Sequence, residues 1–235
     1  MLPKGSFATL ANGFQFHYHD GGQGDVVLFL HGSGTGASGF TNFKKNIDFF
    51  QRNGFRTIVP DLPGYGFSDK PEDEIYTMSF FNNLLLELLD HLNITNCSVV
   101  GNSLGGALAM GLSLEQPKRF SKLILMAPGG LEDFNAYQEM PGIKKLLGDF
   151  LGGEMNQEKI EGLLKLFPYD PSFVTKDIIE DRMEILPLMN QQVLASMDIP
   201  NLSEKLKNNQ TPVLAFWGSN AVSYTHLTLP TTVRV

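Results

Sequence analysis

The segment GNSLG at positions 101–105 places Ser103 between two glycines, each separated from it by one residue. An apolar run typical of a buried strand (CSVV) precedes this segment, and an apolar run of helical type (GALAMGLSL) follows it. G-x-S-x-G in a strand–turn–helix context presents a serine hydroxyl on a tight turn, at the head of a helix whose amides favour a developing negative charge. We therefore predict that Ser103 is a nucleophile. The alternative is a Ser/Gly turn without chemistry.

A glycine-rich turn, HGSGTG at 31–36, follows the apolar run VVLFL at 26–30. Turns of this kind supply a backbone N–H to an oxyanion hole, and the amide of Leu104, directly after the serine, would be the second donor. A flexible loop or a phosphate cradle is the alternative. The phosphate interpretation is weak because the chain has no G-x-x-x-x-G-K-[ST] pattern.

Other polar residues receive structural interpretations. We read DLPGYGFS at 61–68 as a shaped turn that supports the site. His17 and His19 share one strand face without a further ligand at metal spacing, so we expect a solvated face. Cys97 is expected to be a small buried hydrophobe, and His91 to complement the end of a helix.

Strand and helix patterns alternate along the first part of the chain. Residues 14–19 alternate apolar and polar types, which predicts a half-buried strand, and short apolar runs at 26–30, 57–59, 98–100, 123–126 and 213–216 predict strands covered on both faces. Helical stripes lie between them, namely Phe43/Ile47/Phe50 and Leu84/Leu85/Leu88/Leu89/Leu92. This alternation predicts an α/β fold with a mainly parallel sheet.

Only helical patterns occupy the stretch before the last apolar run. We predict a core at 1–130, a helical cap over the carboxyl edge of the sheet at 131–200, and a return to the core at 201–220. Two consecutive crossover helices with long loops are the alternative to a cap.

Composition narrows the function classes. The formal net charge of −7 argues against a nucleic-acid partner, and a single cysteine cannot form an internal disulfide. No signal peptide is readable, and the most apolar window falls short of a membrane span. We expect a soluble, cytoplasmic protein with a small-molecule substrate, no membrane or nucleic-acid partner, no cofactor or metal, and homo-oligomerisation left open.

These motifs together resemble the α/β-hydrolase fold, with helices on both faces of the sheet and a helical cap. More narrowly, HGSGTGASGFTNF, VVGNSLGGALAMGLSLEQPKRFSKLILMAPGGL and IIEDRMEI resemble the meta-cleavage product hydrolases. These enzymes hydrolyse a carbon–carbon bond in 2-hydroxy-6-oxo-hexa-2,4-dienoate-type products of aromatic ring fission. The resemblance covers about residues 13–220.

The resemblance implies a substrate-binding set of Asn42, Asn102, Arg182 and Gly34, which would hold the polar dienoate end of the substrate. A guanidinium can grip a carboxylate through two parallel hydrogen bonds. Without the resemblance, Arg182 would be read as a surface ion pair with a neighbouring carboxylate. Candidates for contact with the apolar end of the substrate are Leu146, Phe150 and Leu166.

The resemblance also implies the order of the chemistry. The dienol is first protonated to its keto form. Ser103 then attacks the C6 carbonyl, the amides of Ser33 and Leu104 stabilise the oxyanion, and the carbon–carbon bond breaks.

The end of the sequence departs from the family pattern. In the family the acid is the aspartate of a W-G-x-x-D motif and a histidine comes later. Here Ala221 stands at the acid position, and His226 is the one histidine after Ser103. The tail at 221–235 (AVSYTHLTLPTTVRV) resembles a translated sequencing adapter. We expect a non-native tail, a fold lacking its last strand and helix, and therefore little or no activity and reduced stability.

Alternatives remain open at this stage. Asp133 or Glu132 could supply the acid, although a base would still be missing. A carboxylesterase of the same fold would not need a carboxylate-binding arginine, and a non-catalytic binding module would fit the absent acid and base. Dehalogenases and epoxide hydrolases are disfavoured because they carry an aspartate where Ser103 stands.

Overall fold

The computed structural model describes residues 2–140, 144, 148, 155–190 and 192–218. The seven strands in this part of the chain are β1 Ser6–Thr9, β2 Gln15–Gly21, β3 Asp25–Leu30, β4 Phe55–Pro60, β5 Cys97–Asn102, β6 Phe120–Met126 and β7 Val213–Phe216. The helices are α1 Gly39–Arg52, α2 Met78–His91, α3 Leu104–Glu115, α4 Phe134–Glu139, α6 Gln157–Leu166, α7 Lys176–Ile185, α8 Gln192–Ser196 and α9 Ser203–Leu206, with single 3-10 turns at Pro171–Phe173 and Leu186–Leu188.

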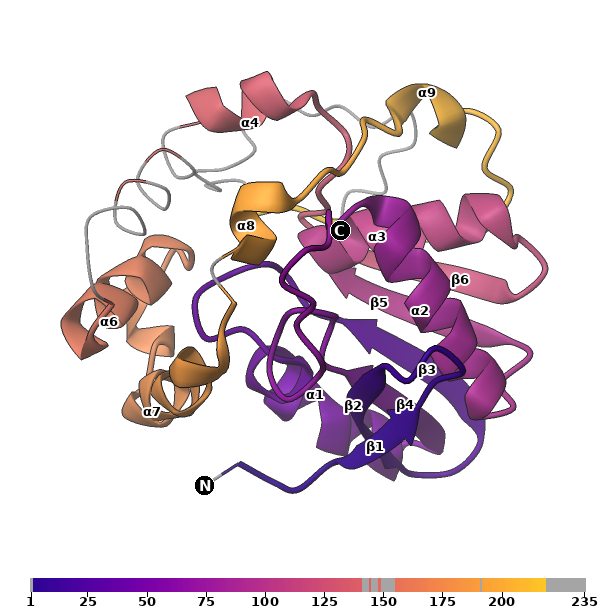
Figure 1. The fold of residues 1–235 in the computed structure, drawn as a ribbon, viewed down its shortest axis with the longest axis horizontal. Coiled ribbons are helices and arrows are strands. Elements are labelled where there is room, and N and C mark those ends of the chain that lie inside the picture. The colour runs from indigo at the N-terminus through magenta and orange to yellow at the C-terminus, as the bar shows by residue number, and fades with distance from the viewer. Residues whose placement is uncertain (1, 141–143, 145–147, 149–154, 191, 219–235) are drawn as a thin grey trace.

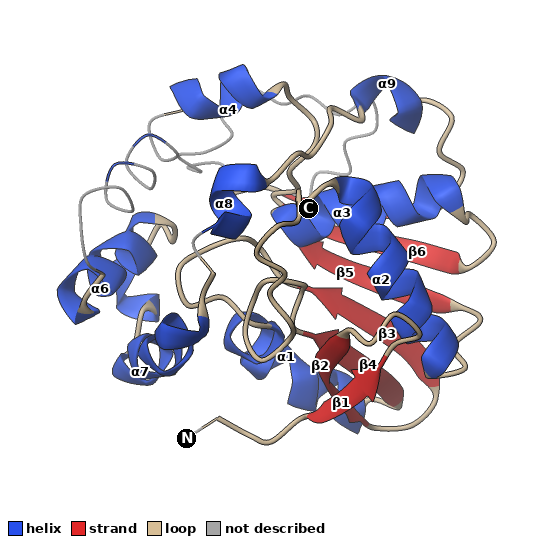
Figure 2. Ribbon diagram, in the orientation of Figure 1, coloured by secondary structure: helices blue, strands red, loops and turns tan. Residues whose placement is uncertain are grey.

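All seven strands form one sheet in the order β1-β2-β4-β3-β5-β6-β7. The pairs β1–β2 and β2–β4 are antiparallel, and the pairs from β4 through β3, β5 and β6 to β7 are parallel. The predicted mainly parallel α/β sheet is confirmed (Figure 2). Strand β1 was not predicted.

Side chains of β3 alternate between two apolar layers, as expected for a strand covered on both faces. Leu28 and Leu30 belong to the larger layer, which also contains the buried faces of α2 and α3. Val27 and Phe29 belong to a smaller layer with Phe43 of α1. Helices therefore lie on both faces of the sheet, and this packing fixes the direction in which β3 delivers its following loop.

Helix α1 begins where its sequence provides a cap. The Ser38 hydroxyl accepts a hydrogen bond from the Thr41 N–H (3.1 Å), and the Thr41 hydroxyl accepts one from the Ser38 N–H (3.0 Å). This reciprocal capping box satisfies two amides that a helix start leaves unpaired. It holds the first turn of α1, which carries Asn42, directly after the glycine-rich turn.

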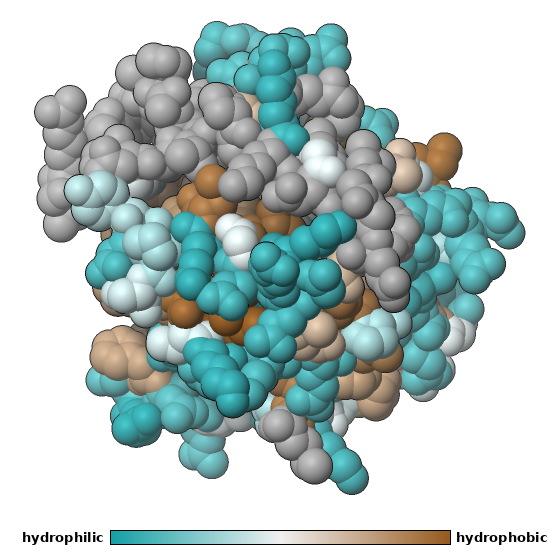
Figure 3. Space-filling model, turned by 90° about the vertical axis from the view of Figure 1, so that its left-hand side faces the viewer, coloured by the Kyte–Doolittle hydropathy of each residue, from teal (hydrophilic) through white to brown (hydrophobic). Residues whose placement is uncertain are grey.

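Between β6 and β7 the named elements of the described residues are all helical, joined by loops, and Figure 1 shows α4, α6, α7 and α8 lying beyond the end of the sheet where β3 and β5 finish. Figure 3 views the side that carries α6 and α7, where the described surface is largely hydrophilic with apolar side chains between the polar ones. The division into core at 1–130 and 201–220 and cap at 131–200 stays a prediction.

The described part of the chain contains no helix long and apolar enough to cross a membrane. The predicted tail at 221–235, with Ala221 and His226, lies outside the described residues. So do the cap candidates Leu146 and Phe150.

Candidate active site

The backbone at Ser103 turns sharply between β5 and α3. Ser103 has φ 50° and ψ −112°, a conformation that residues with a side chain rarely adopt. Its N–H donates to the Met126 carbonyl (3.0 Å), and its own carbonyl accepts from the Gly129 N–H (2.8 Å). The turn is thus fixed on both sides by the chain that follows β6.

The turn requires glycine at 101 and 105, two residues before and after Ser103, because other backbone atoms approach these positions too closely for a Cβ. A Cβ on Gly105 would lie 2.0 Å from the Leu30 carbonyl oxygen, and a Cβ on Gly101 would lie 2.4 Å from the Gly105 oxygen. Both contacts are far below van der Waals separation. The G-x-S-x-G spacing is therefore a packing requirement of the turn and of its contact with the end of β3.

The glycine-rich turn lies against the serine. Leu30 is paired with Gly101 in the sheet, and the His31 carbonyl accepts a hydrogen bond from the Gly105 N–H (3.1 Å). A Cβ on Gly32 would lie 3.2 Å from the Ser103 Cβ. The structure thus brings together the two motifs that the sequence singled out 70 residues apart.

The two predicted oxyanion donors carry free amides. Among the described residues, the N–H groups of Ser33 and Leu104 form no hydrogen bond, and the Ser103 hydroxyl has no partner. Leu104 is the first residue of α3, where an N–H has no acceptor within its own helix. Donors left open in this way could bind an oxyanion formed next to the serine.

His31, the first residue of the glycine-rich turn, is fully buried and serves the backbone. Its Nε2 accepts from the Leu62 N–H (2.9 Å), so Nδ1 carries the proton and donates to the Gly32 carbonyl (2.9 Å). Burial lowers the pKa of His31 to about 4. A neutral ring with both nitrogens engaged is not available as a base for Ser103. His31 instead orients the glycine-rich turn, and this structural role was not predicted from the sequence.

Asn42 and Asn102 both border the glycine-rich turn. The Asn42 Oδ1 lies 3.5 Å from the Gly32 nitrogen, and a Cβ on Gly32 would lie 2.8 Å from the Asn102 Oδ1. The Asn102 Nδ2 donates to the Met126 carbonyl (3.2 Å). Both side chains are half-buried, which leaves part of each amide able to meet a ligand. Gly34 lies in the same turn, with open space where a Cβ would be.

Arg182 on α7 reaches the same turn from the helical region. Its Nη1 donates to the Thr35 carbonyl (3.4 Å), and its own carbonyl oxygen lies 2.4 Å from where a Cβ on Gly36 would be. The neighbouring carboxylates have other partners, since Glu180 pairs with Lys176 (3.1 Å) and Asp181 with Lys44 (2.5 Å). Arg182 is therefore not the surface ion pair that its local sequence suggests.

Two buried polar atoms at this contact lack partners. The Arg182 Nε and the Thr35 hydroxyl are both shielded from solvent and form no hydrogen bond within the described part of the chain. Burial also lowers the pKa of Arg182 to about 10, well above neutral pH. Unpaired buried donors are costly, and a bound acceptor would relieve that cost.

The solvated histidine face expected on the second strand is wrong for His17. His17 is 3% exposed, and its Nδ1 lies 2.7 Å from the Asp61 Oδ2. Asp61 also accepts from the N–H groups of Gly39 (2.8 Å) and Phe67 (2.9 Å). Burial raises the pKa of Asp61, but these hydrogen bonds outweigh it and lower the pKa overall. The 61–68 segment is thus a shaped turn with a buried ionic centre.

Metal binding has no support among the described histidine, cysteine, aspartate and glutamate side chains, which form no group of three able to hold an ion. The alternative acid Asp133 accepts a hydrogen bond from the Asn201 Nδ2 (3.1 Å) at the surface. Cys97 is buried, as predicted. Leu166 is half-buried at the end of α6.

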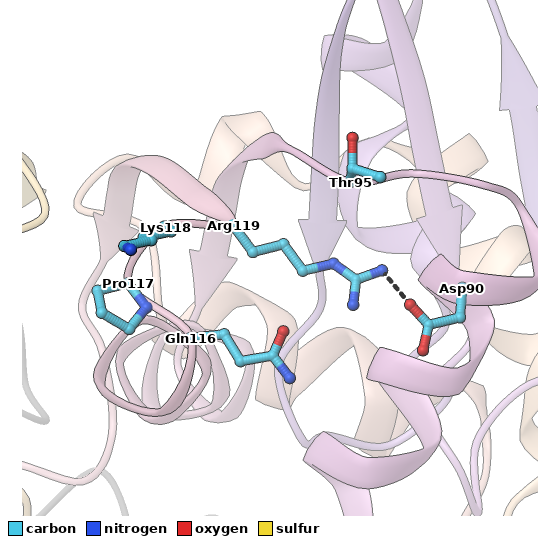
Figure 4. Close-up of a pocket in the computed structure, with 6 residues that line it drawn as sticks. All are labelled: Asp90, Thr95, Gln116, Pro117, Lys118 and Arg119. Atoms are coloured by element: carbon cyan, nitrogen blue, oxygen red, sulfur yellow. Dashed lines mark ion pairs between the residues drawn. The ribbon is translucent and has the colours of Figure 1, made fainter.

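A cavity of about 460 Å³ lies at the end of the sheet where β5 and β6 begin, away from the end that carries Ser103 (Figure 4). It is lined by Asp90, Thr95, Gln116, Pro117, Lys118 and Arg119. Arg119 crosses it to pair with Asp90 (2.7 Å) and donates to the Ile94 carbonyl (2.7 Å). Arg119 therefore ties the start of β6 to the end of α2, away from the turn that carries Ser103.

The fold and the serine turn define an α/β-hydrolase, and the sequence profile described as alpha/beta hydrolase fold matches residues 25–159. The chain is 34% identical over 215 residues to the 2-hydroxy-6-oxo-6-phenylhexa-2,4-dienoate hydrolase of Burkholderia cepacia, covering 87% of this chain and 74% of that protein. It is 33% identical to the 2-hydroxy-6-oxononadienedioate/2-hydroxy-6-oxononatrienedioate hydrolase of Comamonas testosteroni, with the same coverage.

Solved structures agree. A meta-cleavage product hydrolase from Pseudomonas fluorescens superposes with a TM-score of 0.74 at 28% identity, covering 90% of this chain and 78% of that one. An esterase from Exiguobacterium antarcticum has a TM-score of 0.76 at 21% identity and covers 93% of this chain and 83% of that one, which shows the shared fold alone. The chain therefore belongs to the meta-cleavage product hydrolases, a family of hydrolases acting on carbon–carbon bonds in ketonic substances.

Proposed function

We propose that this chain binds a 2-hydroxy-6-oxo-hexa-2,4-dienoate and hydrolyses its C5–C6 bond. The observation that carries the proposal is the convergence of Ser103 and Arg182 on one glycine-rich turn, where the Arg182 Nε has no partner among the described residues. The named relatives act on dienoates of this class.

The carboxylate end of the substrate would bind Arg182. Its Nε and the Thr35 hydroxyl are unpaired donors at one contact, which suits an acceptor with two oxygens. Asn42, Asn102 and the Gly34 backbone would orient the neighbouring 2-oxygen.

The reaction begins when the C2 hydroxyl of the dienol loses its proton and C5 gains one, giving a C2 ketone and a saturated C5. The Ser103 hydroxyl, losing its proton, adds to the C6 carbonyl, and the amides of Ser33 and Leu104 hold the oxyanion. When the oxyanion collapses, the C5–C6 electron pair moves through C4 and C3 onto the C2 oxygen. This releases 2-hydroxypenta-2,4-dienoate and leaves an acyl group on Ser103, and water then frees the acid.

Attack requires a base to accept the Ser103 proton and an acid to orient that base. The predicted absence of both concerns positions that lie outside the described residues, so the expectation of low activity stays a prediction. The core at 1–130 and 201–220, the cap at 131–200, a cytoplasmic location and the absence of a nucleic-acid partner are likewise proposed. The single cysteine supports the cytoplasmic location, and the net charge of −7 supports the absence of a nucleic-acid partner.

The test compares 2-hydroxy-6-oxo-6-phenylhexa-2,4-dienoate with a p-nitrophenyl ester, following benzoate and p-nitrophenol separately. We expect slow dienoate cleavage that disappears in Ser103→Ala and in Arg182→Met. Cleavage of the p-nitrophenyl ester is expected to disappear in Ser103→Ala and to persist in Arg182→Met.

A carboxylesterase would instead show ester turnover with dienoate turnover that Arg182→Met does not change. A non-catalytic module would bind the dienoate and release no product even over many hours. Benzoate release that persists in Ser103→Ala would contradict the proposed mechanism.

A further inference from the structure

Two aspartates of α7 converge on one lysine of α1. The Lys44 Nζ lies 2.7 Å from the Asp177 Oδ2 and 2.5 Å from the Asp181 Oδ2. Asp177 and Asp181 are four residues apart and therefore lie on one face of the helix. Lys44 thus bridges two successive turns of α7.

The Lys44–Asp181 pair is more shielded than an ordinary surface ion pair, while Asp177 is 59% exposed. The side chains of Lys44 and Asp181 are each 18% exposed, whereas Lys176 and Glu180 on the same helix are 84% and 61% exposed. Burial lowers the pKa of Lys44, but the hydrogen bonds to Asp177 and Asp181 outweigh it and raise the pKa overall. Exposed pairs contribute little because water screens them, while a shielded lysine with two carboxylates resists separation.

The bridge lies next to the proposed carboxylate site on both helices. On α7, Asp181 precedes Arg182, whose carbonyl lies against Gly36 and whose Nη1 reaches the Thr35 carbonyl. On α1, Lys44 follows Asn42 by two residues in the helix that the Ser38 cap begins. The turn of α7 that carries Arg182 is therefore held at the glycine-rich turn and at Lys44.

We propose that Lys44 is a positioning residue, which through Asp177 and Asp181 fixes α7 so that the Arg182 guanidinium meets the substrate carboxylate. This inference rests on the proposed function. Lys44 itself does not touch the substrate. Removal of the Lys44 charge would let α7 shift. A misplacement of about 1 Å, caused by a mutation far from the reacting atoms, can lower a reaction rate by as much as about 100-fold.

The experiment measures binding by isothermal titration in a Ser103→Ala background, so that no ligand is consumed. The ligands are 2-hydroxy-6-oxo-6-phenylhexa-2,4-dienoate and its methyl ester, which differ in the charge that Arg182 would meet. We expect Lys44→Gln to weaken binding of the acid about tenfold and to leave the ester unchanged. Lys44→Arg should restore most of the loss, because it keeps the charge.

Two controls separate positioning from other effects. Lys45→Gln removes the same charge from an exposed neighbour on the same helix and should leave both affinities unchanged. In an Arg182→Met background, Lys44→Gln should have no further effect on the acid, since the lysine acts through that arginine. If Lys44→Gln does not fold, Asp181→Asn gives the same readout while keeping the pair with Asp177.

Equal weakening for the acid and the ester would overturn the inference, as would a full effect of Lys44→Gln in the Arg182→Met background. If Arg182→Met matters and Lys44→Gln does not, the inference fails and the proposed function stands. If Arg182→Met leaves acid binding unchanged, or the chain binds no dienoate, the proposed function fails and the inference with it.

Discussion

Replacing Ser103 by glycine should stabilise the protein relative to replacing it by alanine. Both variants lose the hydroxyl, so their difference reports the backbone. At φ 50° and ψ −112° a residue with a Cβ is strained, and such strain costs about 1–3 kcal/mol. Glycine removes it but adds about 0.4–1 kcal/mol of freedom to the unfolded chain. The expected net gain is therefore about 1 kcal/mol.

Urea denaturation followed by circular dichroism measures this difference, and a thermal midpoint about 2–4 °C higher should accompany it in a chain of this length. The matched control is Ser113 in α3, a buried serine within a regular helix. There glycine should be less stable than alanine by about 1 kcal/mol, the opposite sign. If the glycine variant at 103 is also the less stable of its pair, the strained turn is refuted.

Three further predictions follow from single contacts. Gly105→Ala should destabilise by about 2 kcal/mol or more, because its Cβ would meet the Leu30 carbonyl oxygen at 2.0 Å; an unchanged urea midpoint would contradict this packing. Thr35→Val should weaken binding of the dienoate acid about five- to tenfold by removing a donor beside Arg182, and titration calorimetry showing equal affinities would exclude that donor. The buried His31 has a pKa of about 4 in the folded protein and about 6.5 in the unfolded chain, so the unfolded chain takes up a proton first as the pH falls. The free energy of unfolding should therefore fall by up to about 3 kcal/mol between pH 6.5 and pH 4. Urea titrations that show no such loss, or the same loss in His31→Gln, would contradict this prediction.

Local patterns were sufficient to predict much of the core. The apolar run at 213–216 coincides with β7, and the leucine stripe falls within α2 except for Leu92, which directly follows that helix. The serine turn was predictable because its glycines and the strand and helix patterns around it follow one another in the sequence, although the contact that excludes a Cβ at Gly105 comes from Leu30 of β3. In these cases the apolar pattern of consecutive residues is enough to predict which segment is buried.

Features that depend on distant partners were missed or misread. His17 is buried because Asp61, 44 residues away, accepts its hydrogen bond. The bridge at Lys44 depends on carboxylates more than 130 residues later in the chain. Strand β1 has four residues and one buried side chain, too little for a period to be recognised.

Arg182 shows what the family resemblance added. Its sequence neighbours are acidic, so local charge favours a surface ion pair. The structure shows instead that those carboxylates pair with Lys176 and Lys44, and that Arg182 contacts the glycine-rich turn.

The most direct test is a crystal structure of the Ser103→Ala variant with 2-hydroxy-6-oxo-6-phenylhexa-2,4-dienoate bound. The carboxylate should lie within hydrogen-bonding distance of the Arg182 guanidinium. The C6 carbonyl oxygen should point at the amides of Ser33 and Leu104, with C6 next to residue 103. A dienoate bound with its carboxylate away from Arg182, or with C6 out of reach of residue 103, would contradict the account.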